Sequence, residues 1–186
     1  MRKLDMDELN RKTVDEFKSS TKIPLIIVLD NIRSMHNVGS IFRTADAFLL
    51  ESIYLCGFTP RPPHRDIHKT ALGATETVDW KYFDKTMEAA HFLRSRGYGL
   101  LAVEQVELST PLNGKYSNSA KKLAVVFGNE VTGVSEEVLA CCEGSLEIPQ
   151  FGMKHSLNVA VAAGIVIWEL VRERISHLQE KDESYR

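Results

Sequence analysis

The chain has 186 residues, of which 44% are hydrophobic and 26% charged, which is typical of one globular domain with at most a short appendage. Its formal net charge of -2 excludes binding to nucleic acid through a uniformly basic surface, so such binding requires a local patch. The three cysteines have no metal-ligand spacing, and this sparse, odd number indicates a reducing cytoplasm.

The first predicted element is a polar amphipathic helix within residues 1–22, which we interpret as an appendage. This segment is charged throughout and lacks the apolar core of a signal peptide. The longest apolar run, residues 159–168, is too short to cross a membrane. We therefore expect a main domain over residues 23–176, followed by a polar tail over residues 177–186.

The main domain alternates between strand and helix patterns. Runs rich in Val, Ile and Leu predict strands over residues 24–32, 52–57, 78–83, 98–105, 122–130 and 144–149. Helical patterns cover residues 37–50, 86–97, 134–142 and everything from Asn158 onward, with a short helix near residues 67–72 in a Pro-rich loop. This order predicts an α/β fold with a mostly parallel sheet and helices on both faces.

Polar residues collect just after the predicted strands, where open α/β sheets bind ligands. They are Asn31, Arg33, Asn37 and Arg43 after the first strand, Glu104 after the fourth, Gly128, Asn129, Glu130 and Gly133 after the fifth, and Ser156 and Asn158 after the last. Each has an ordinary structural alternative: helix caps, turn glycines, or one ion pair between Arg43 and Glu130. Their shared position at one sheet edge favours a functional site.

Several enzyme classes lack their motifs here. The chain has no G-x-G-x-x-G after the first strand, no G-x-x-x-x-G-K-[ST] and no G-x-S-x-G, which argues against dinucleotide, P-loop and α/β-hydrolase sites. The six histidines are scattered without metal spacing, so no metal is expected.

Three segments carry a family resemblance. HNVGSIFRTADAF (36–48), VVFGNEVTGVS (125–135) and IPQFGMKHSLNVAVAAGIVIWEL (148–170) resemble, in order, the signature motifs of the SpoU (TrmH) family of RNA ribose 2'-O-methyltransferases in the SPOUT superfamily. The segment KTALGATETVDW (69–80) is also similar to this family. The resemblance covers roughly residues 24–172, and three motifs in the correct order are far more specific than any one of them.

The resemblance implies a C-terminal trefoil knot that binds S-adenosylmethionine, an exception to the usual absence of knots. It also implies a homodimer. The loop from Gln150 to His155 would wrap around the cofactor, and the small residues Ala160, Ala162, Ala163 and Gly164 would let the closing helix pass through the knot and pack on a second subunit. By the same resemblance, the cofactor contacts are Val103, Glu104, Gly128, Asn129, Ile148, Met153, Ser156 and Leu157.

The same resemblance assigns the catalytic positions Asn37, Arg43, Glu130, Ser156 and Asn158. In this family the matching arginine is assigned the general-base role, whereas a guanidinium, which rarely loses its proton, is at least as well suited to stabilising an alkoxide or binding a phosphate. Glu130 would orient Arg43, and Asn37 and Asn158 would position the ribose and the motif loops.

RNA contacts require local positive charge, which the loop PRPPHRDIHK supplies. The candidate RNA-binding residues are Arg33, Arg61, His64, Arg65, His68, Lys69, Lys154 and His155, although the loop could also be only a solvated connector. We expect a tRNA substrate, with rRNA as the alternative. Other hypotheses are a SPOUT enzyme that methylates a base, an RNA-binding protein of this fold without turnover, and an unrelated doubly wound protein.

Overall fold

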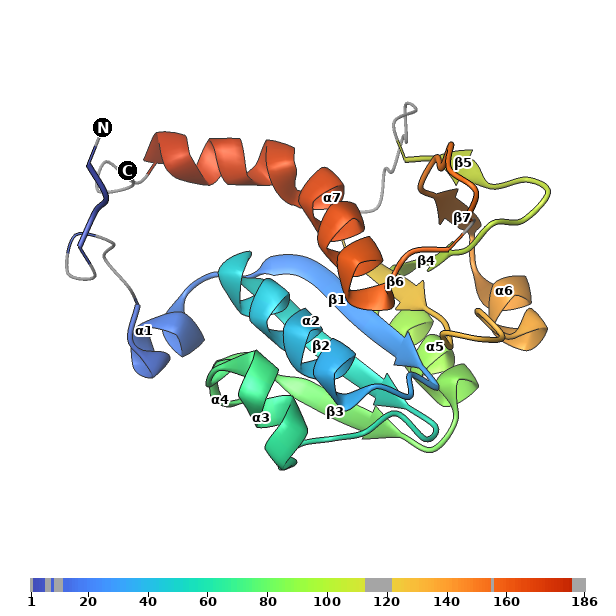
Figure 1. Cartoon of the computed structure of the whole chain (residues 1–186), viewed down its shortest axis with the longest axis horizontal. Coiled ribbons are helices and arrows are strands. Elements are labelled where there is room, and N and C mark those ends of the chain that lie inside the picture. Colours follow the sequence, from blue (N-terminus) through green and yellow to red (C-terminus); the bar gives the residue numbers. More distant parts are fainter. Residues whose placement is uncertain (1, 6–7, 9–11, 113–121, 155, 182–186) are drawn as a thin grey trace.

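A computed structural model of the chain describes residues 2–5, 8, 12–112, 122–154 and 156–181, and its centre is one seven-stranded sheet. Every pairing in the sheet is parallel, in the order β3-β2-β1-β6-β4-β7-β5 (Figure 1). The strands are β1 (Ile23–Asp30), β2 (Leu50–Cys56), β3 (Trp80–Phe83), β4 (Gly99–Val103), β5 (Thr110–Pro111), β6 (Leu123–Phe127) and β7 (Gly144–Glu147). The predicted α/β fold with a parallel sheet is confirmed.

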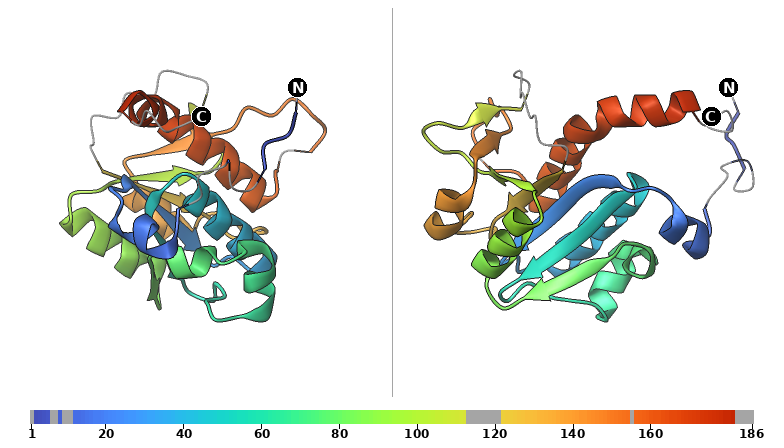
Figure 2. Two further views of the ribbon diagram at one scale, coloured as in Figure 1. Left: turned by 90° about the vertical axis from the view of Figure 1, so that its left-hand side faces the viewer. Right: turned by 180° about the vertical axis from the view of Figure 1, so that it is seen from behind.

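Helices cover both faces of the sheet (Figures 1 and 2). They are α1 (Val14–Ser19), α2 (Met35–Ala47), α3 (Arg65–Ala71), α4 (Ala74–Thr77), α5 (Thr86–Ser95), α6 (Glu136–Cys141) and α7 (Val159–Lys181). Because side chains alternate along a strand, β1 feeds two cores. Ile27 and Leu29 pack with α2, α3 and α7, whereas Ile26 and Val28 pack with α5 and α6. This double burial explains the continuous apolar run in β1.

The direction of the chain across the sheet reverses beside β1. From β1 the chain proceeds to β2 and β3 on one side, and β4 then enters on the other side, beyond β6. Ligand sites in such sheets lie at this switch, outside the carboxyl ends of the strands. The segment 148–158 leaves β7 and returns to this end of the sheet, where α7 begins beside β1 and α2. The predicted trefoil threading of this segment stays a prediction.

The structure corrects several predicted boundaries. Among the described residues of the N-terminal segment, only α1 is an α-helix; it begins after Thr13, whose side chain and that of Glu16 form a capping box. Helix α2 starts two residues earlier than predicted, because Ser34 accepts a hydrogen bond from the backbone of Asn37 and caps it. Its end is also earlier, since Leu49 adopts a left-handed conformation (φ 55) and Leu50 already belongs to β2. A two-residue strand, β5, lies between the predicted strands 98–105 and 122–130, where the sequence pattern predicts no strand.

Helix α7 begins in the core and then extends beyond the sheet (Figure 2). Val166, Ile167 and Val171 are fully buried, so these three residues add no exposed apolar surface to the helix. Val161 and Trp168, in contrast, are 52% and 51% exposed. Within the described residues, none of the helices is long and apolar enough to cross a membrane.

Candidate active site

Two asparagines and one glutamate join all three motif segments at the carboxyl end of β1 and β6. The Asn158 Nδ2 donates to Asn37 Oδ1 at 3.0 Å, and the Asn37 Nδ2 donates to Glu130 Oε1 at 3.1 Å. The three residues come from the start of α7, the first turn of α2 and the turn after β6. The structure therefore brings together three of the five predicted catalytic residues.

The carboxylate of Glu130, from the turn after β6, lies against the N-terminus of α2. Its carboxylate accepts the backbone N–H of Arg33 at 2.9 Å and that of Ser34 at 3.2 Å, in addition to Asn37. Partial burial alone would raise the pKa of Glu130, but these hydrogen bonds outweigh it and hold the pKa below its usual value. A negative charge at this position is also favoured by the helix dipole. Glu130 therefore fixes the loop before α2 as an ionised carboxylate.

Arg43 lies elsewhere, so the predicted contact in which Glu130 orients it is not formed. Arg43 is six residues beyond Asn37, about 9 Å along the helix axis. Its side chain is exposed, and the described chain provides it with no ion pair or hydrogen bond. Arg43 thus lies exposed on α2, without a partner among the described residues.

Asn158 also starts α7. Its Oδ1 accepts the backbone N–H groups of Ala160 at 2.9 Å and Val161 at 3.3 Å, which is N-cap geometry. The alternative in which Ser156 caps this helix is therefore wrong. Ser156 lies two residues earlier and is exposed. The Asn158 side chain caps α7 with its oxygen and binds Asn37 with its nitrogen.

The turn after β6 is closed by Asn129. Its Oδ1 accepts from the backbone of Val131 and Thr132, and its Nδ2 donates to the Asn31 carbonyl at 2.7 Å. Two backbone hydrogen bonds, at 3.0 and 2.9 Å, pair Asn129 with Gly133. Asn129 is 9% exposed, so its amide holds the Glu130 turn against the end of β1.

Two positions in this turn require glycine, for different reasons. A Cβ on Gly128 would lie 2.1 Å from the Val134 nitrogen, whereas Gly133 has a φ of +69, in the left-handed region that favours glycine. The Glu104 carboxylate accepts from the Val134 backbone at 3.0 Å and from Gln105 at 3.1 Å. Glu104, predicted as a cofactor contact, thus uses its carboxylate to support the turn.

The sequence interpretation missed two residues that support the site. Ser34 caps α2, whereas the sequence pattern alone favours Asn37 as the cap. Asp30, the last residue of β1, is 2% exposed; it accepts from Thr86 Oγ1, from Asn31 Nδ2 at 2.8 Å and from the Ser135 backbone at 3.4 Å. In the sequence, Asp30 is recognisable as a carboxylate that ends an otherwise apolar strand. Ser135 immediately precedes α6, but its side chain forms no capping hydrogen bond.

Segment 148–157 fits a cofactor that is recognised by the main chain. Within the described part of this segment, no peptide group is hydrogen-bonded to another described residue. Ile148 is half-buried, whereas Met153 and Leu157 are 86% and 41% exposed. Open peptide groups flanked by apolar side chains suit an adenine ring, which needs hydrogen bonds at its edge and apolar contact on its faces. Val103, half-buried, ends β4 beside this region.

The predicted RNA-binding residues divide into paired and unpaired cations. Lys69 forms an ion pair with Asp66 at 2.7 Å, and the Arg61 guanidinium lies 4.1 Å from the centre of the Tyr82 ring. His64 caps α3 by accepting from the Asp66 backbone. Arg33, Arg65 and Lys154 are exposed, and none of them has a side-chain partner among the described residues.

His155 lies outside the described residues, so its predicted RNA contact has no structural counterpart here. In the part of the chain that is described, no three His, Cys, Asp or Glu side chains are grouped to hold a metal ion.

Comparison with known proteins gives consistent matches. Residues 24–168 match the SpoU rRNA Methylase family. A tRNA (guanosine(18)-2'-O)-methyltransferase of Thermus thermophilus is 32% identical over 168 residues, covering 90% of this chain and 84% of the relative. A TrmH/SpoU tRNA modifying enzyme of A. aeolicus has a TM-score of 0.77 and 26% identity, covering 88% of this chain and 82% of its own. An AdoMet-bound rRNA methyltransferase of Sinorhizobium meliloti has a TM-score of 0.76 and 27% identity, and the match covers 82% of this chain and 57% of that protein's chain.

Proposed function

Because the chain belongs to the SpoU rRNA Methylase family, we propose that it transfers a methyl group from S-adenosylmethionine to a ribose 2'-hydroxyl in RNA. The observation that carries this proposal is the connected set Glu130, Asn37 and Asn158, which fixes the three motif segments at one edge of the sheet. In addition, the structural relative from S. meliloti is AdoMet-bound, and segment 148–157 offers open peptide groups for such a cofactor.

The cofactor, when bound, supplies an activated methyl group on a cationic sulfonium. The residues of this chain have to hold the ribose and stabilise the charge that develops on its 2'-oxygen. Backbone groups near Gly128, Ile148, Met153 and Leu157 would hold the adenosine. Asn37, held on both sides by Glu130 and Asn158, keeps the loops in register, and the exposed Ser156 is available to the ribose.

Arg43 acts as an electrostatic stabiliser in this proposal. A guanidinium keeps its proton at neutral pH, so it is a poor general base. A fixed cation beside the developing alkoxide or the adjacent phosphate lowers the transition-state energy, and the proton of the 2'-hydroxyl passes to solvent water.

The separation of Arg43 from the Glu130 network supports a site completed by a homodimer. Val161, Ile165 and Trp168 lie exposed along α7, and a Cβ added to Gly164 would meet open space. A second subunit on this helix would cover apolar side chains that the single chain leaves in water. It would also bring Arg43 of one subunit toward the cofactor segment of the other.

The substrate we favour is tRNA, because the T. thermophilus and A. aeolicus relatives are named as tRNA enzymes. Ribosomal RNA is the second candidate, because the S. meliloti relative is named as an rRNA methyltransferase.

The test is methylation of purified tRNA and rRNA by the protein with isotopically labelled S-adenosylmethionine, followed by nucleoside mass spectrometry. We expect one labelled 2'-O-methylnucleoside, and the same nucleoside missing from RNA of a deletion strain. A label on a base, or failure to bind labelled S-adenosylmethionine, would contradict the proposal.

A further inference from the structure

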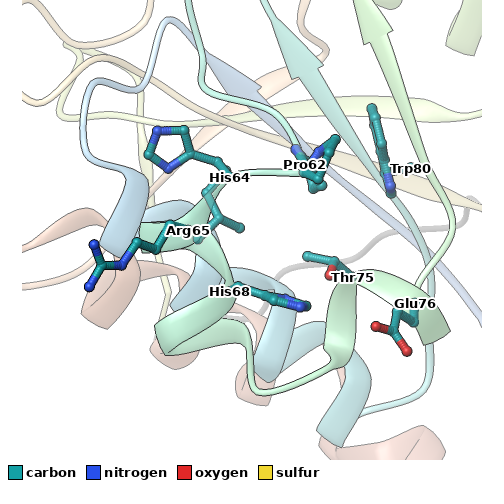
Figure 3. A pocket seen from close by; sticks show the side chains of 9 residues that line it. Pro62, His64, Arg65, His68, Thr75, Glu76 and Trp80 are labelled. Carbon is teal, nitrogen blue, oxygen red and sulfur yellow. The ribbon is translucent and has the colours of Figure 1, made fainter.

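A cavity of about 470 Å³ lies between α3, α4 and β3, away from the Glu130 network (Figure 3). Its volume is within the range of about 300–1,000 Å³ found for ligand pockets. It is lined by Pro62, Pro63, His64, Arg65, Ile67, His68, Thr75, Glu76 and Trp80. Nothing in the methyl-transfer mechanism uses this cavity.

The walls provide flat surfaces suited to a planar ring. The Trp80 indole and the Pro62 ring lie near one another at one end, and His68 and Thr75 lie opposite them, on the two helices (Figure 3). Trp80 is half-buried and packs on the main core, so its ring is held as a fixed platform. Stacking on aromatic side chains is the usual way in which proteins bind unpaired RNA bases.

The polar groups of the cavity favour guanine. Glu76 and Trp80 have no side-chain partner among the described residues. A carboxylate only accepts hydrogen bonds, and two parallel donors make the strongest pair with it. Among the four bases, guanine alone presents two adjacent donors, N1–H and N2–H, on its pairing edge. Adenine has one exocyclic amino group there, beside an acceptor nitrogen that a carboxylate repels.

The cavity is physically attached to the proposed active site through α3. The Thr70 hydroxyl donates to the His36 carbonyl at 3.0 Å, one residue before Asn37. Gly39 of α2 lies so close to α3 that a Cβ there would be 2.4 Å from the Ile67 carbonyl oxygen. Arg65 is exposed beside the cavity and points away from Trp80 (Figure 3), where it can meet a phosphate. An RNA strand that leaves the ribose site can therefore reach both the cavity and Arg65.

We propose that this cavity binds a guanine base of the RNA substrate, in a nucleotide close to the one that is methylated. Trp80 stacks on the base, Glu76 accepts from its N1–H and N2–H groups, and Arg65 contacts the backbone. The inference rests on the proposed RNA methyltransferase function for the identity of the RNA, but the base preference is measurable without methyl transfer.

The experiment uses short single-stranded oligoribonucleotides, one with a single guanosine among uridines and one with adenosine in its place. We expect the guanosine oligomer to quench tryptophan fluorescence and to bind about tenfold more tightly than the adenosine oligomer, as a charge-assisted hydrogen bond predicts. Trp80→Phe should remove the quenching, and Glu76→Gln should remove the preference for guanosine. Glu88→Gln, an exposed glutamate on α5, is the matched control and should leave both intact.

Equal binding of the two oligomers by the wild type, or a preference that survives Glu76→Gln, would overturn the assignment. Free guanosine monophosphate binding as tightly as the oligomer would make this a nucleotide site, which also contradicts it. Labelled methyl transfer is assayed separately. Methylation without guanosine preference defeats only this inference, whereas guanosine preference without methylation defeats only the proposed function.

Discussion

The side-chain amide of Asn158 donates to that of Asn37 at 3.0 Å, joining residues 121 positions apart in the chain. The same Asn158 side chain caps α7 through its oxygen, and the Asn37 amide in turn donates a hydrogen bond to Glu130. One short chain of hydrogen bonds thus fixes the start of α7 relative to α2 and to the turn after β6.

Changes at Asn158 should separate capping from the connection to Asn37. Asn158→Ala removes both, and we expect the free energy of unfolding to fall by about 1 kcal/mol together with loss of methyl transfer. Asn158→Asp keeps a good capping oxygen but replaces the donor by an acceptor. It should unfold in urea close to wild type while activity falls. Activity unchanged in Asn158→Asp would show that the hydrogen bond to Asn37 has no role in the reaction.

Arg43→Ala should abolish methyl transfer but not cofactor binding. Arg43 is exposed on α2, outside segment 148–157, and a contact to a developing oxyanion is worth about a hundred- to thousandfold in rate. Single-turnover rates with labelled cofactor, compared with calorimetric S-adenosylmethionine affinity, test this. A collapse of cofactor affinity would instead identify Arg43 as structural.

Arg61→Ala with Arg65→Ala should weaken RNA binding and flatten its dependence on salt. The slope of log affinity against log salt should fall by roughly one unit for each phosphate that the protein no longer neutralises, with S-adenosylmethionine affinity unchanged. Lys81→Ala with Arg96→Ala is the matched control, because it also removes two exposed cations, which here lie over the Phe92 ring on another part of the surface. An unaltered slope in the first pair would make the loop a solvated connector, and would favour the N-terminal cations Arg2, Lys3, Arg11 and Lys12.

Val161→Glu should dissociate the proposed homodimer. Val161 is 52% exposed in the first turn of α7, and a buried, unpaired carboxylate in an interface is strongly unfavourable. Light scattering at micromolar concentration should give twice the monomer mass for the wild type and the monomer mass for the variant. Val14→Glu, at a 41% exposed valine on α1, should remain dimeric. An active wild-type monomer would contradict the proposal.

Because of Glu130, the free energy of unfolding should depend on pH in the acidic range. Its pKa is lower in the folded chain, where backbone N–H groups bind the carboxylate, than in the unfolded chain, where an ordinary value is about 4.3. Its ionisation therefore stabilises the fold above that pH, and the stabilisation is lost as pH falls through the folded value. We expect wild type to exceed Glu130→Gln in urea stability at neutral pH, and the difference to shrink below about pH 4. A constant difference would show that charge is not involved, and Glu88→Gln serves as control.

The sequence by itself predicted the alternation of strands and helices, because fully buried strands such as β1 require continuous apolar residues. It also predicted which sheet edge carries the polar residues, since parallel strands end together. The three motifs identified the family and hence the positions Asn37, Glu130 and Asn158.

Only the tertiary structure decided which of these residues meet. Glu130 reaches Asn37 and the backbone before α2 rather than Arg43, because the N-terminus of α2 faces the turn after β6, whereas Arg43 is nearly two turns along the helix. It also decided that Ser34 and Asn158 cap their helices, and that Trp80 and Glu76 line one cavity. Such contacts depend on the packing of segments distant in the chain, which local sequence patterns do not specify.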